Sequence, residues 1–287
     1  MTDVVINKKN ILLFGSTGLI GNFFLSSIDT NKYNIYKIGR QSSDIFLDLS
    51  KDIDLTVFEK FSEGDIAIYL SAISAPQKCI DDFELSYQIN VKSTSKIIQL
   101  LLDKGVYVFF ASSDVVYGET ENIVNEHSDI DPKNGYALMK YEIEKMFFHY
   151  DTFKIFRLSY VWSFENSFSN FLISSYKKNE SIEVFDQFIR SIVDINDVIL
   201  FIKKCCKEPN RINKITNVCG PEFISRLDLV AFISNLISIK YNVTHNDTNF
   251  FLYRPKKIFM KSLYFEETIE KKPESIFNVL DKIKDYI

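Results

Sequence analysis

The stretch LLFGSTGLIG constrains this 287-residue chain more than any other. Three of its nine glycines, Gly15, Gly18 and Gly21, lie between an apolar run and a helix-like pattern that begins at Leu19. In a strand–loop–helix context, the first glycine permits a tight turn. The second lets the backbone approach a pyrophosphate, and the third lets helix and strand pack closely. We therefore expect a dinucleotide at the helix N-terminus; the alternative is a glycine-rich turn without a ligand.

Short apolar runs alternate with longer helical patterns through the first half of the chain. The apolar runs begin at residues 11, 34, 65, 106 and 153, and the helical patterns span 19–28, 83–105 and 136–150. Strands joined by crossover helices indicate an α/β fold with a doubly wound, parallel Rossmann sheet. KITNVCG, from residue 214, predicts another strand. Ser225 with Asp228 predicts a helix that begins with a variant of the capping box.

The pattern loosens after residue 160. We expect a dinucleotide-binding Rossmann domain over 1–160. Residues 161–287 would form mainly a smaller α/β substrate-binding lobe, with segments around 190–218 returning to the first domain. The sequence shows no internal repeat and no clear linker, so we expect the two parts to be interleaved.

Composition argues against several classes of protein. The net charge is -4, with 34 Lys and Arg against 38 Asp and Glu, and no basic stripe indicates nucleic-acid binding. No apolar run approaches the roughly 20 residues that span a bilayer, and the N-terminus does not resemble a signal peptide. The four cysteines form no C-x-x-C pair, and the three histidines show no metal-ligand spacing. We expect a cytoplasmic protein with reduced thiols and no metal.

The segment NGYALMK places Tyr136 four residues before Lys140, on the same face of a predicted helix. A tyrosine with an ordinary pKa of about 10 is a poor proton donor or base at neutral pH. A cation one helical turn away stabilises the phenolate and lowers that pKa. The pair therefore predicts proton transfer, whereas a surface tyrosine loosely paired with a lysine is the structural alternative.

The G-x-x-G-x-x-G loop and the Tyr-x-x-x-Lys pair together resemble the extended short-chain dehydrogenase/reductase family, also called the NAD-dependent epimerase/dehydratase family, and especially its nucleotide-sugar branch. Further segments match in the same order over almost the full length. They are FLDLS, LSAIS, INVKST, ASSDVVYG, FIRSIVDINDV and YRPKK. One departure is that the Asn expected at the start of the LSAIS segment is missing.

The resemblance implies a role for three sets of residues. Its catalytic triad would be Ser113, Tyr136 and Lys140. Its cofactor site would contain Gly15, Ser16, Thr17, Gly18, Leu19, Ile20, Gly21, Arg40, Asp48, Leu49, Leu70, Ser71, Ala72, Asn90, Ala111, Tyr136, Lys140 and Leu158. Its substrate site would contain Ser74, Ser113, Asp114, Asn166, Asn170, Arg190 and Arg254.

Two arginines carry specific expectations. Arg40 follows the second strand, where enzymes that select NAD usually have an acidic residue and an Arg accommodates a 2′-phosphate. NADPH is therefore the expected cofactor, with NAD possible if Arg40 is only a solvated residue near Asp44. The resemblance implies that Arg190 contacts the diphosphate of a nucleotide sugar, and a guanidinium suits bidentate binding of phosphate. Its alternative is an ion pair with Asp194 or Asp197.

Three positions narrow the implied reaction. The family's sugar 4,6-dehydratases have a proton-transferring Glu where this chain has Val115, and its epimerase branch has an Asn where this chain has Tyr160. The Ser113–Asp114 pair is similar to that of 4-ketoreductases. The sequence thus predicts NADPH-dependent reduction of a nucleotide-linked 4-keto-6-deoxyhexose. An NAD-dependent 4-epimerase and a cofactor-binding regulator remain as alternatives, and a homodimer stays open.

Overall fold

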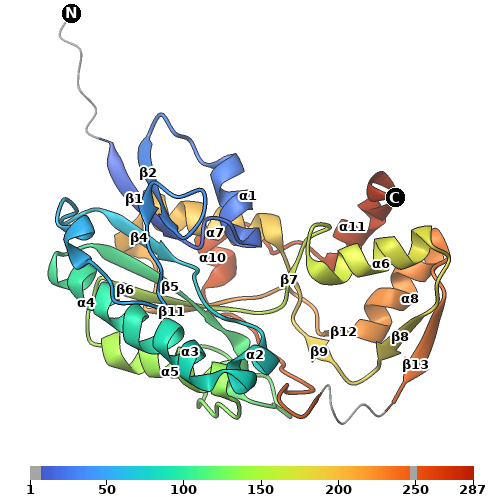
Figure 1. The fold of residues 1–287 in the computed structure, drawn as a ribbon. Helices are drawn as coiled ribbons and strands as arrows, with labels where there is room; N and C mark the ends of the chain where they lie inside the picture. The colour runs from blue at the N-terminus through green and yellow to red at the C-terminus, as the bar shows by residue number, and fades with distance from the viewer. Residues whose placement is uncertain (1–7, 246–250) are drawn as a thin grey trace, which may run out of the picture. The chain divides into compact units, whose positions relative to one another are not determined.

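The computed structural model describes residues 8–245 and 251–287 of the chain. In the first part, these elements follow one another (Figure 1): β1 (Lys9–Phe14), α1 (Leu19–Ser27), β2 (Tyr33–Gly39), β3 (Ile45–Phe46), β4 (Ile66–Tyr69), α2 (Pro76–Asp81), α3 (Phe83–Tyr87), the π-helical turn η2 (Gln88–Ser93), α4 (Thr94–Asp103), β5 (Tyr107–Ser113), α5 (Gly135–Phe147) and β6 (Phe153–Leu158).

The described second part contains short strands, the longer helices α6, α7 and α8, and two helices of five residues each. Its elements are β7 (Val161–Trp162), α6 (Ser167–Lys177), β8 (Ile182–Phe185), β9 (Ile189–Arg190), β10 (Val193–Asp194), α7 (Ile195–Lys207), β11 (Ile215–Val218), β12 (Ile224–Ser225), α8 (Arg226–Ile237), β13 (Tyr241–Thr244), α10 (Phe265–Ile269) and α11 (Ile276–Leu280).

A seven-stranded sheet has the order β11-β6-β5-β4-β1-β2-β3. The β1–β2, β1–β4, β2–β3 and β4–β5 pairs are all parallel. The strand order reverses between β1 and β4, so right-handed crossovers place α1 and α4 on opposite faces of the sheet, as Figure 1 shows. The predicted doubly wound α/β fold is confirmed.

The central strands are apolar without alternation because helices cover both faces of the sheet. All four residues of β4 are buried, as are the last four of β1. The rings of Phe14 and Tyr69 stack with their centroids 4.6 Å apart. This packing explains why short apolar runs marked these strands in the sequence, whereas the two-residue strand β3 left no such signal.

The helical pattern predicted over 83–105 is interrupted. It consists of α3, the π-helical turn η2 and α4, and the helix ends before Gly105, which has a φ of +74°. A π-helical turn inserts one residue into the helical repeat and is frequent at functional sites. The apolar spacing correctly predicted helix, but not the break.

The chain divides into two compact units. The first takes the chain up to Ala111 together with 142–155 and 202–214. The second takes 112–141, 156–201 and the residues from 215 onward. The two units are interleaved along the chain. The division into a cofactor domain and a substrate lobe at residue 160 is a functional statement and stays a prediction.

The second unit has its own apolar core, in which Trp162, Leu172 and Ile233 are fully buried. Two strand pairs accompany it, antiparallel β9–β12 and parallel β8–β13. Helix α8 begins at a capping box in which the Ser225 hydroxyl accepts from the Asp228 amide and the Asp228 carboxylate accepts from the Ser225 amide. That predicted helix start is confirmed.

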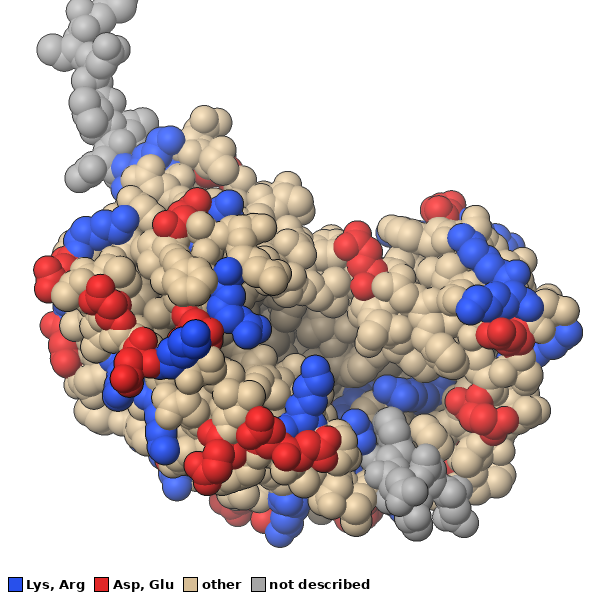
Figure 2. All heavy atoms as spheres, in the orientation of Figure 1, with Lys and Arg blue, Asp and Glu red and all other residues tan. Residues whose placement is uncertain are grey.

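Charge is mixed over the described surface. On the face in Figure 2, Lys and Arg side chains are interspersed with Asp and Glu. None of the described helices is long and apolar enough to cross a membrane. Cys79, Cys205, Cys206 and Cys219 are all buried, and none of these four described residues forms a disulfide.

Gly21 provides a test of the packing between β1 and α1. A Cβ at residue 21 would overlap the Gly15 carbonyl oxygen and lie 2.9 Å from Ser16 Cα. We expect Gly21→Ala to destabilise the protein by about 1–3 kcal/mol in denaturant unfolding, despite alanine's better helix propensity. Gly39→Ala is the matched control, because a Cβ there meets no atom within 4 Å. Equal stability of the two variants would contradict this close packing.

Candidate active site

The glycine loop leaves β1 in a conformation suited to phosphate. Gly15 has a φ of +85°, which disfavours a side chain, and its carbonyl accepts from the Gly18 amide at 3.1 Å. Gly18 is the extended N-cap residue of α1, and both Thr17 and Gly18 are exposed. The first-turn amides of α1 can therefore meet an anion without an intervening side chain.

A cavity lies beside this loop, entirely within the first unit. It is formed by residues that follow β1, β2, β3 and β4, where the strand order reverses. Such a switch point at the carboxyl ends of parallel strands is the usual binding crevice of doubly wound folds. Ten predicted cofactor residues line it: Gly15, Ser16, Thr17, Gly18, Arg40, Asp48, Leu49, Leu70, Ser71 and Ala72.

Other predicted cofactor residues of this unit support the cavity rather than line it. Leu19 and Ile20 begin α1, Gly21 packs against the loop, and Ala111 is buried in β5. The sequence reading missed several lining residues: Phe14, Ile38, Gly39, Gln41, Leu47, Ile73 and Ile89. Most are apolar and carry no motif, so only their positions at strand ends could have indicated them.

Asn90 lies in the π-helical turn and holds part of the cavity wall. Its carboxamide oxygen accepts from the Ile73 amide at 2.8 Å, and its amide nitrogen donates to the Ile73 carbonyl at 2.9 Å. Asn90 is 4% exposed. The Asn90 side chain therefore takes the place of a backbone partner for Ile73, and it holds the segment that follows Ala72.

Arg40 is exposed and lines the same cavity. Asp44 is engaged elsewhere, since its carboxylate accepts from the Lys37 amide at 2.8 Å and lies 3.8 Å from Lys37 Nζ. Hydrogen bonds from Ser50 lower the pKa of Asp48, and the charge of Arg40 lowers it further. The cavity thus presents a cation and a carboxylate at its rim.

The predicted triad lies in the second unit. Ser113 ends β5, and Tyr136 and Lys140 lie one turn apart on α5. Lys140 is 4% exposed, and its Nζ lies 5.7 Å from the centroid of the Tyr136 ring. Asn134 orients the start of α5, because its side chain accepts from the Ala137 amide and donates to the Tyr253 carbonyl. Leu158, a predicted cofactor contact, is half-buried at the end of β6.

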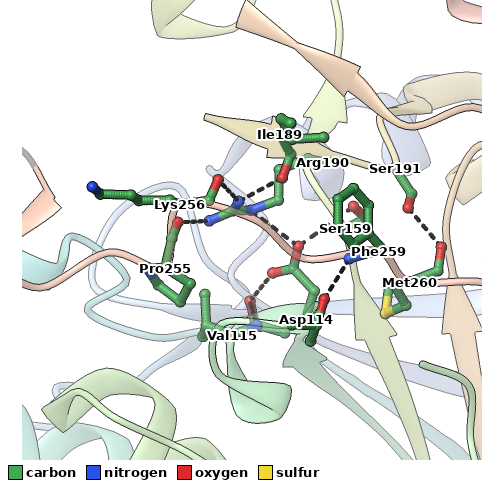
Figure 3. A network of polar contacts seen from close by, with 12 residues as sticks. Asp114, Val115, Ser159, Ile189, Arg190, Ser191, Pro255, Lys256, Phe259 and Met260 are labelled. Atoms are coloured by element: carbon green, nitrogen blue, oxygen red, sulfur yellow. Dashed lines mark hydrogen bonds and ion pairs between the residues drawn. The ribbon is translucent and has the colours of Figure 1, made fainter. Parts of the chain in front are cut away.

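A buried ion pair adjoins Ser113. Arg190 faces Asp114 (Figure 3), with Arg190 Nε 3.5 Å from Asp114 Oδ2, and both side chains are almost fully buried. Ser113 Oγ donates to Asp114 Oδ1 at 3.1 Å, and Ser159 Oγ donates to Oδ2 at 3.4 Å. Asp114 therefore contacts the predicted catalytic serine directly.

Burial works against both charges. It raises the pKa of Asp114 above its ordinary value, although the Arg190 charge acts in the opposite direction. Burial also lowers the pKa of Arg190 to about 10, which leaves the guanidinium protonated at neutral pH. Such a pair is costly to break, because removing one partner leaves the other charge buried and uncompensated.

Arg190 pairs with Asp114 rather than with Asp194 or Asp197. The Asp194 carboxylate accepts from Asn196, while Asp197 Oδ1 lies 2.5 Å from Lys271 Nζ. Arg190 thus forms an ion pair, as the alternative to a diphosphate contact predicted, but its partner is Asp114. A contact between Arg190 and a diphosphate stays a prediction.

The other predicted substrate residues have varied surroundings. Asn166 caps α6 by accepting from the Ser169 amide, and exposed Asn170 donates to the Glu165 carbonyl. Arg254 is half-buried, and the resulting desolvation lowers its pKa. Ser74 is exposed in the first unit.

Arg226 is a cation that the sequence reading missed. Its guanidinium lies over the rings of Phe168 and Phe188, 4.5 and 4.7 Å from their centroids. It helps to line a small cavity of the second unit together with Tyr160 and Arg190. Arg226 opens α8 in no recognisable motif, so only tertiary structure identifies it.

A model of the NAD dependent epimerase/dehydratase family matches residues 11–219. The chain belongs to this family. The match contains the glycine loop, Asn90, the triad and Arg190. The residues present also fit the family's dinucleotide, because the loop backbone lines the cavity and a Cβ on Gly15 would crowd the Leu70–Ser71 backbone beside it.

Two curated relatives match part of the chain. The ADP-L-glycero-D-manno-heptose-6-epimerase of Brachyspira hyodysenteriae is 28% identical over 170 residues, covering 50% of this chain and 52% of the relative. The dTDP-4-dehydrorhamnose reductase of Salmonella typhimurium is 26% identical over 183 residues, covering 62% of this chain and 61% of the relative. The chain thus spans about half to three-fifths of their lengths.

Solved structures share this fold over nearly the whole chain. The UDP-glucuronic acid 4-epimerase from Bacillus cereus, in complex with UDP-glucuronic acid and NAD, has a TM-score of 0.80 and 18% identity, and covers 96% of this chain and 98% of its own. The dTDP-4-dehydrorhamnose reductase from Bacillus anthracis, in complex with NADP, has a TM-score of 0.81 and 20% identity, and covers 97% and 99%. Epimerases and reductases both carry this fold.

Proposed function

We propose that the protein reduces the C4 keto group of a nucleotide-linked 4-keto-6-deoxyhexose with NADPH. The observation that carries the proposal is the arrangement of Ser113 at the end of β5 with Tyr136 and buried Lys140 on one face of α5. This arrangement supplies a hydroxyl, a phenol and a cation in the same unit. Those are the groups that a carbonyl needs when negative charge develops on its oxygen.

Each group has a separate task in this proposal. Ser113 Oγ hydrogen-bonds the keto oxygen and orients the carbonyl, and the Tyr136 hydroxyl gives that oxygen its proton. The positive charge of Lys140 favours the phenolate that remains on Tyr136. When bound, NADPH would supply the hydride to C4. The ketone thus becomes a secondary alcohol, and the phenolate recovers its proton from water.

The cofactor would be held by the glycine loop and the cavity of the first unit. Its pyrophosphate would lie at the N-terminus of α1. Arg40 supports NADPH over NADH because it lines that cavity and could pair with a 2′-phosphate, while Asp44 is engaged with Lys37. Of the two solved structures described above, the epimerase is in complex with NAD and the reductase is in complex with NADP.

On the substrate side, Arg254 is the proposed diphosphate contact, and Asn166, Asn170 and Ser74 are proposed sugar or phosphate contacts. Reduction rather than dehydration is supported by Val115, which cannot transfer a proton. Reduction rather than epimerisation is supported by Tyr160 in place of the Asn of the epimerase branch. Deoxysugar biosynthesis in the cytoplasm belongs to the same proposal.

A 4-epimerase is the second candidate. It is favoured by the likeness to a 4-epimerase that binds NAD. That reaction would use the same serine, tyrosine and lysine, but it would return the hydride to the sugar. Net consumption of the cofactor therefore separates the two functions.

The proposed reaction is tested by mixing the protein with NADPH and a dTDP- or CDP-linked 4-keto-6-deoxyhexose. We expect absorbance of the reduced nicotinamide to fall in step with formation of the C4 alcohol, because each turnover consumes one hydride. Chromatography of the sugar nucleotide measures the product. Conversion of a UDP-hexose without loss of NADPH would establish the epimerase instead.

Substitution of Tyr136 tests the proton donor. We expect Tyr136→Phe to keep NADPH affinity within a few-fold and lower kcat by roughly 10²–10⁴, the usual worth of a positioned general acid. Lys140→Met should impair both NADPH binding and kcat, since the resemblance assigns the lysine to the nicotinamide ribose as well. Tyr286→Phe, at an exposed tyrosine, serves as the control. Unchanged turnover in Tyr136→Phe would remove this residue from the mechanism.

Arg40→Asp tests the cofactor preference. The change removes a partner of the 2′-phosphate and puts like charge beside it, so NADPH binding should weaken much more than NADH binding. Hydrogen bonds to charged groups contribute about 1.5–3 kcal/mol, which corresponds to roughly 10–100-fold in the affinity ratio. Fluorescence titration measures both affinities. Arg211→Asp, at an exposed arginine of the same unit, should leave the ratio where it was.

A further inference from the structure

Two lysines of the first unit lie close together at the start of neighbouring strands. Lys154 is the second residue of β6, and Lys214 directly precedes β11, which is next to β6 in the sheet. The Ile155 amide donates to the Lys214 carbonyl at 2.9 Å, so the strand register places the two lysines beside each other. Both side chains are half-buried, and both residues belong to the first unit.

Uncharged groups hold the Lys214 side chain in place. Its Nζ donates to the Tyr150 carbonyl and lies 5.3 Å from the centroid of the Phe148 ring and 5.8 Å from that of Phe153. Phe148 is exposed, so this aromatic side of Lys214 lies at the surface of the protein. The amine is therefore fixed in position and still within reach of a reagent in solution.

The charges of Lys154 and Asp151 act on Lys214. The pKa of Lys214 is lowered to about 8, first by burial and then by the like charge of Lys154, while the Asp151 carboxylate acts in the opposite direction. The same carboxylate favours the protonated form of Lys154. A lysine that is desolvated next to a second cation keeps more of its amine neutral and becomes a nucleophile.

A structural role accounts for only one of the two lysines. The hydrogen bond to the Tyr150 carbonyl explains where Lys214 lies. It does not explain Lys154 beside it, because two like charges in a half-buried place repel each other. The pair is better suited to an anionic electrophile, since one lysine supplies a neutral amine and the other a positive charge.

We propose that Lys214 is an acylation site for acyl phosphates, with Lys154 as the cation that attracts the phosphate group. The neutral Lys214 amine attacks the carbonyl carbon of the acyl phosphate. A C–N bond forms, the C–O bond to the phosphate breaks, and inorganic phosphate leaves with the electron pair of that bond. The amine nitrogen gives up one proton to water. The amide N–H that remains can still donate to the Tyr150 carbonyl.

This site is separate from the proposed reductase site. Neither Lys154 nor Lys214 lines the cavity beside the glycine loop, and neither belongs to the predicted triad. Acylation therefore needs no bound dinucleotide and no sugar substrate. The two proposals can fail independently of each other.

Acetyl phosphate is the probe for the parent protein. The folded protein is incubated with it at about pH 7.5, and mass spectrometry of chymotryptic peptides measures acetylation at each lysine. We expect Lys214 to react about tenfold or more faster than exposed Lys51 and Lys178, because its lowered pKa leaves more of its amine neutral. The pH profile of its rate should have a midpoint of about 8. A rate at Lys214 no higher than at the two exposed lysines would overturn the site.

Two substitutions beside Lys214 have opposite expected effects. Lys154→Met removes a like charge and the cation for the phosphate, so acetylation of Lys214 should slow by about fivefold or more. Asp151→Asn removes a carboxylate that favours the charged amine and repels the reagent, so acetylation should become roughly two- to threefold faster. Lys178→Met, at an exposed lysine of the other unit, is the matched control and should react like the parent. An unchanged rate in Lys154→Met would refute the pair.

A neutral reagent separates the two effects of Lys154. With p-nitrophenyl acetate, Lys154→Met changes only the pKa of Lys214, because this reagent carries no phosphate for the cation to attract. The slowing should therefore be at least about twofold smaller than with acetyl phosphate. Equal slowing with both reagents would refute the role of Lys154 toward the phosphate. Thermal unfolding checks that Lys154→Met is folded, and the rates and pH profile of the parent decide the site if it is not.

Discussion

The carbonyl oxygen of Gly15 occupies the space that a side chain on residue 21 would need, and the architecture of the first unit depends on this contact. It brings the first turn of α1 against the end of β1, so that the helix N-terminus faces the carboxyl edge of the sheet. Right-handed crossovers on both sides of β1 then open a crevice beside that turn. The proposed phosphate-binding loop and the cavity beside it both result from this one close approach of two backbones.

The second unit depends on a different constraint, a pair of opposite charges in a poorly solvated environment. Asp114 and Arg190 are separated by 76 positions in the sequence, yet the pair joins the end of β5 to β9 and to the segment after Arg254. Burial disfavours both charges, so the pair persists only because several hydrogen bonds satisfy each partner. Such a pair is better suited to fixing geometry than to adding stability, which agrees with its place beside Ser113.

Helix periodicity alone misses the turn that serves the cavity. The apolar spacing over 83–105 predicted one continuous helix, because the spacing of three and four persists across the break. The π-helical turn Gln88–Ser93 changes the direction of Asn90, which then bonds both the amide and the carbonyl of Ile73. The INVKST segment identified Asn90 as important, but the Ile73 backbone to which it bonds becomes its neighbour only in the folded sheet.

Local patterns in the sequence determined the parallel α/β sheet, the glycine loop and the Tyr136–Lys140 pair. Each of these depends on residues close together in the chain, where the periodicities of strand and helix and the size of glycine act directly. Only the tertiary structure decided what the arginines contact. A guanidinium suits phosphate, carboxylate and carbonyl alike, so the residue type at 190 could not distinguish a substrate ligand from a partner of Asp114. Arg226 carried no signal at all, because its aromatic neighbours come from separate elements. The packing of the elements decides which distant residues a side chain with several hydrogen-bonding groups contacts. The residues next to it in the sequence do not determine those contacts.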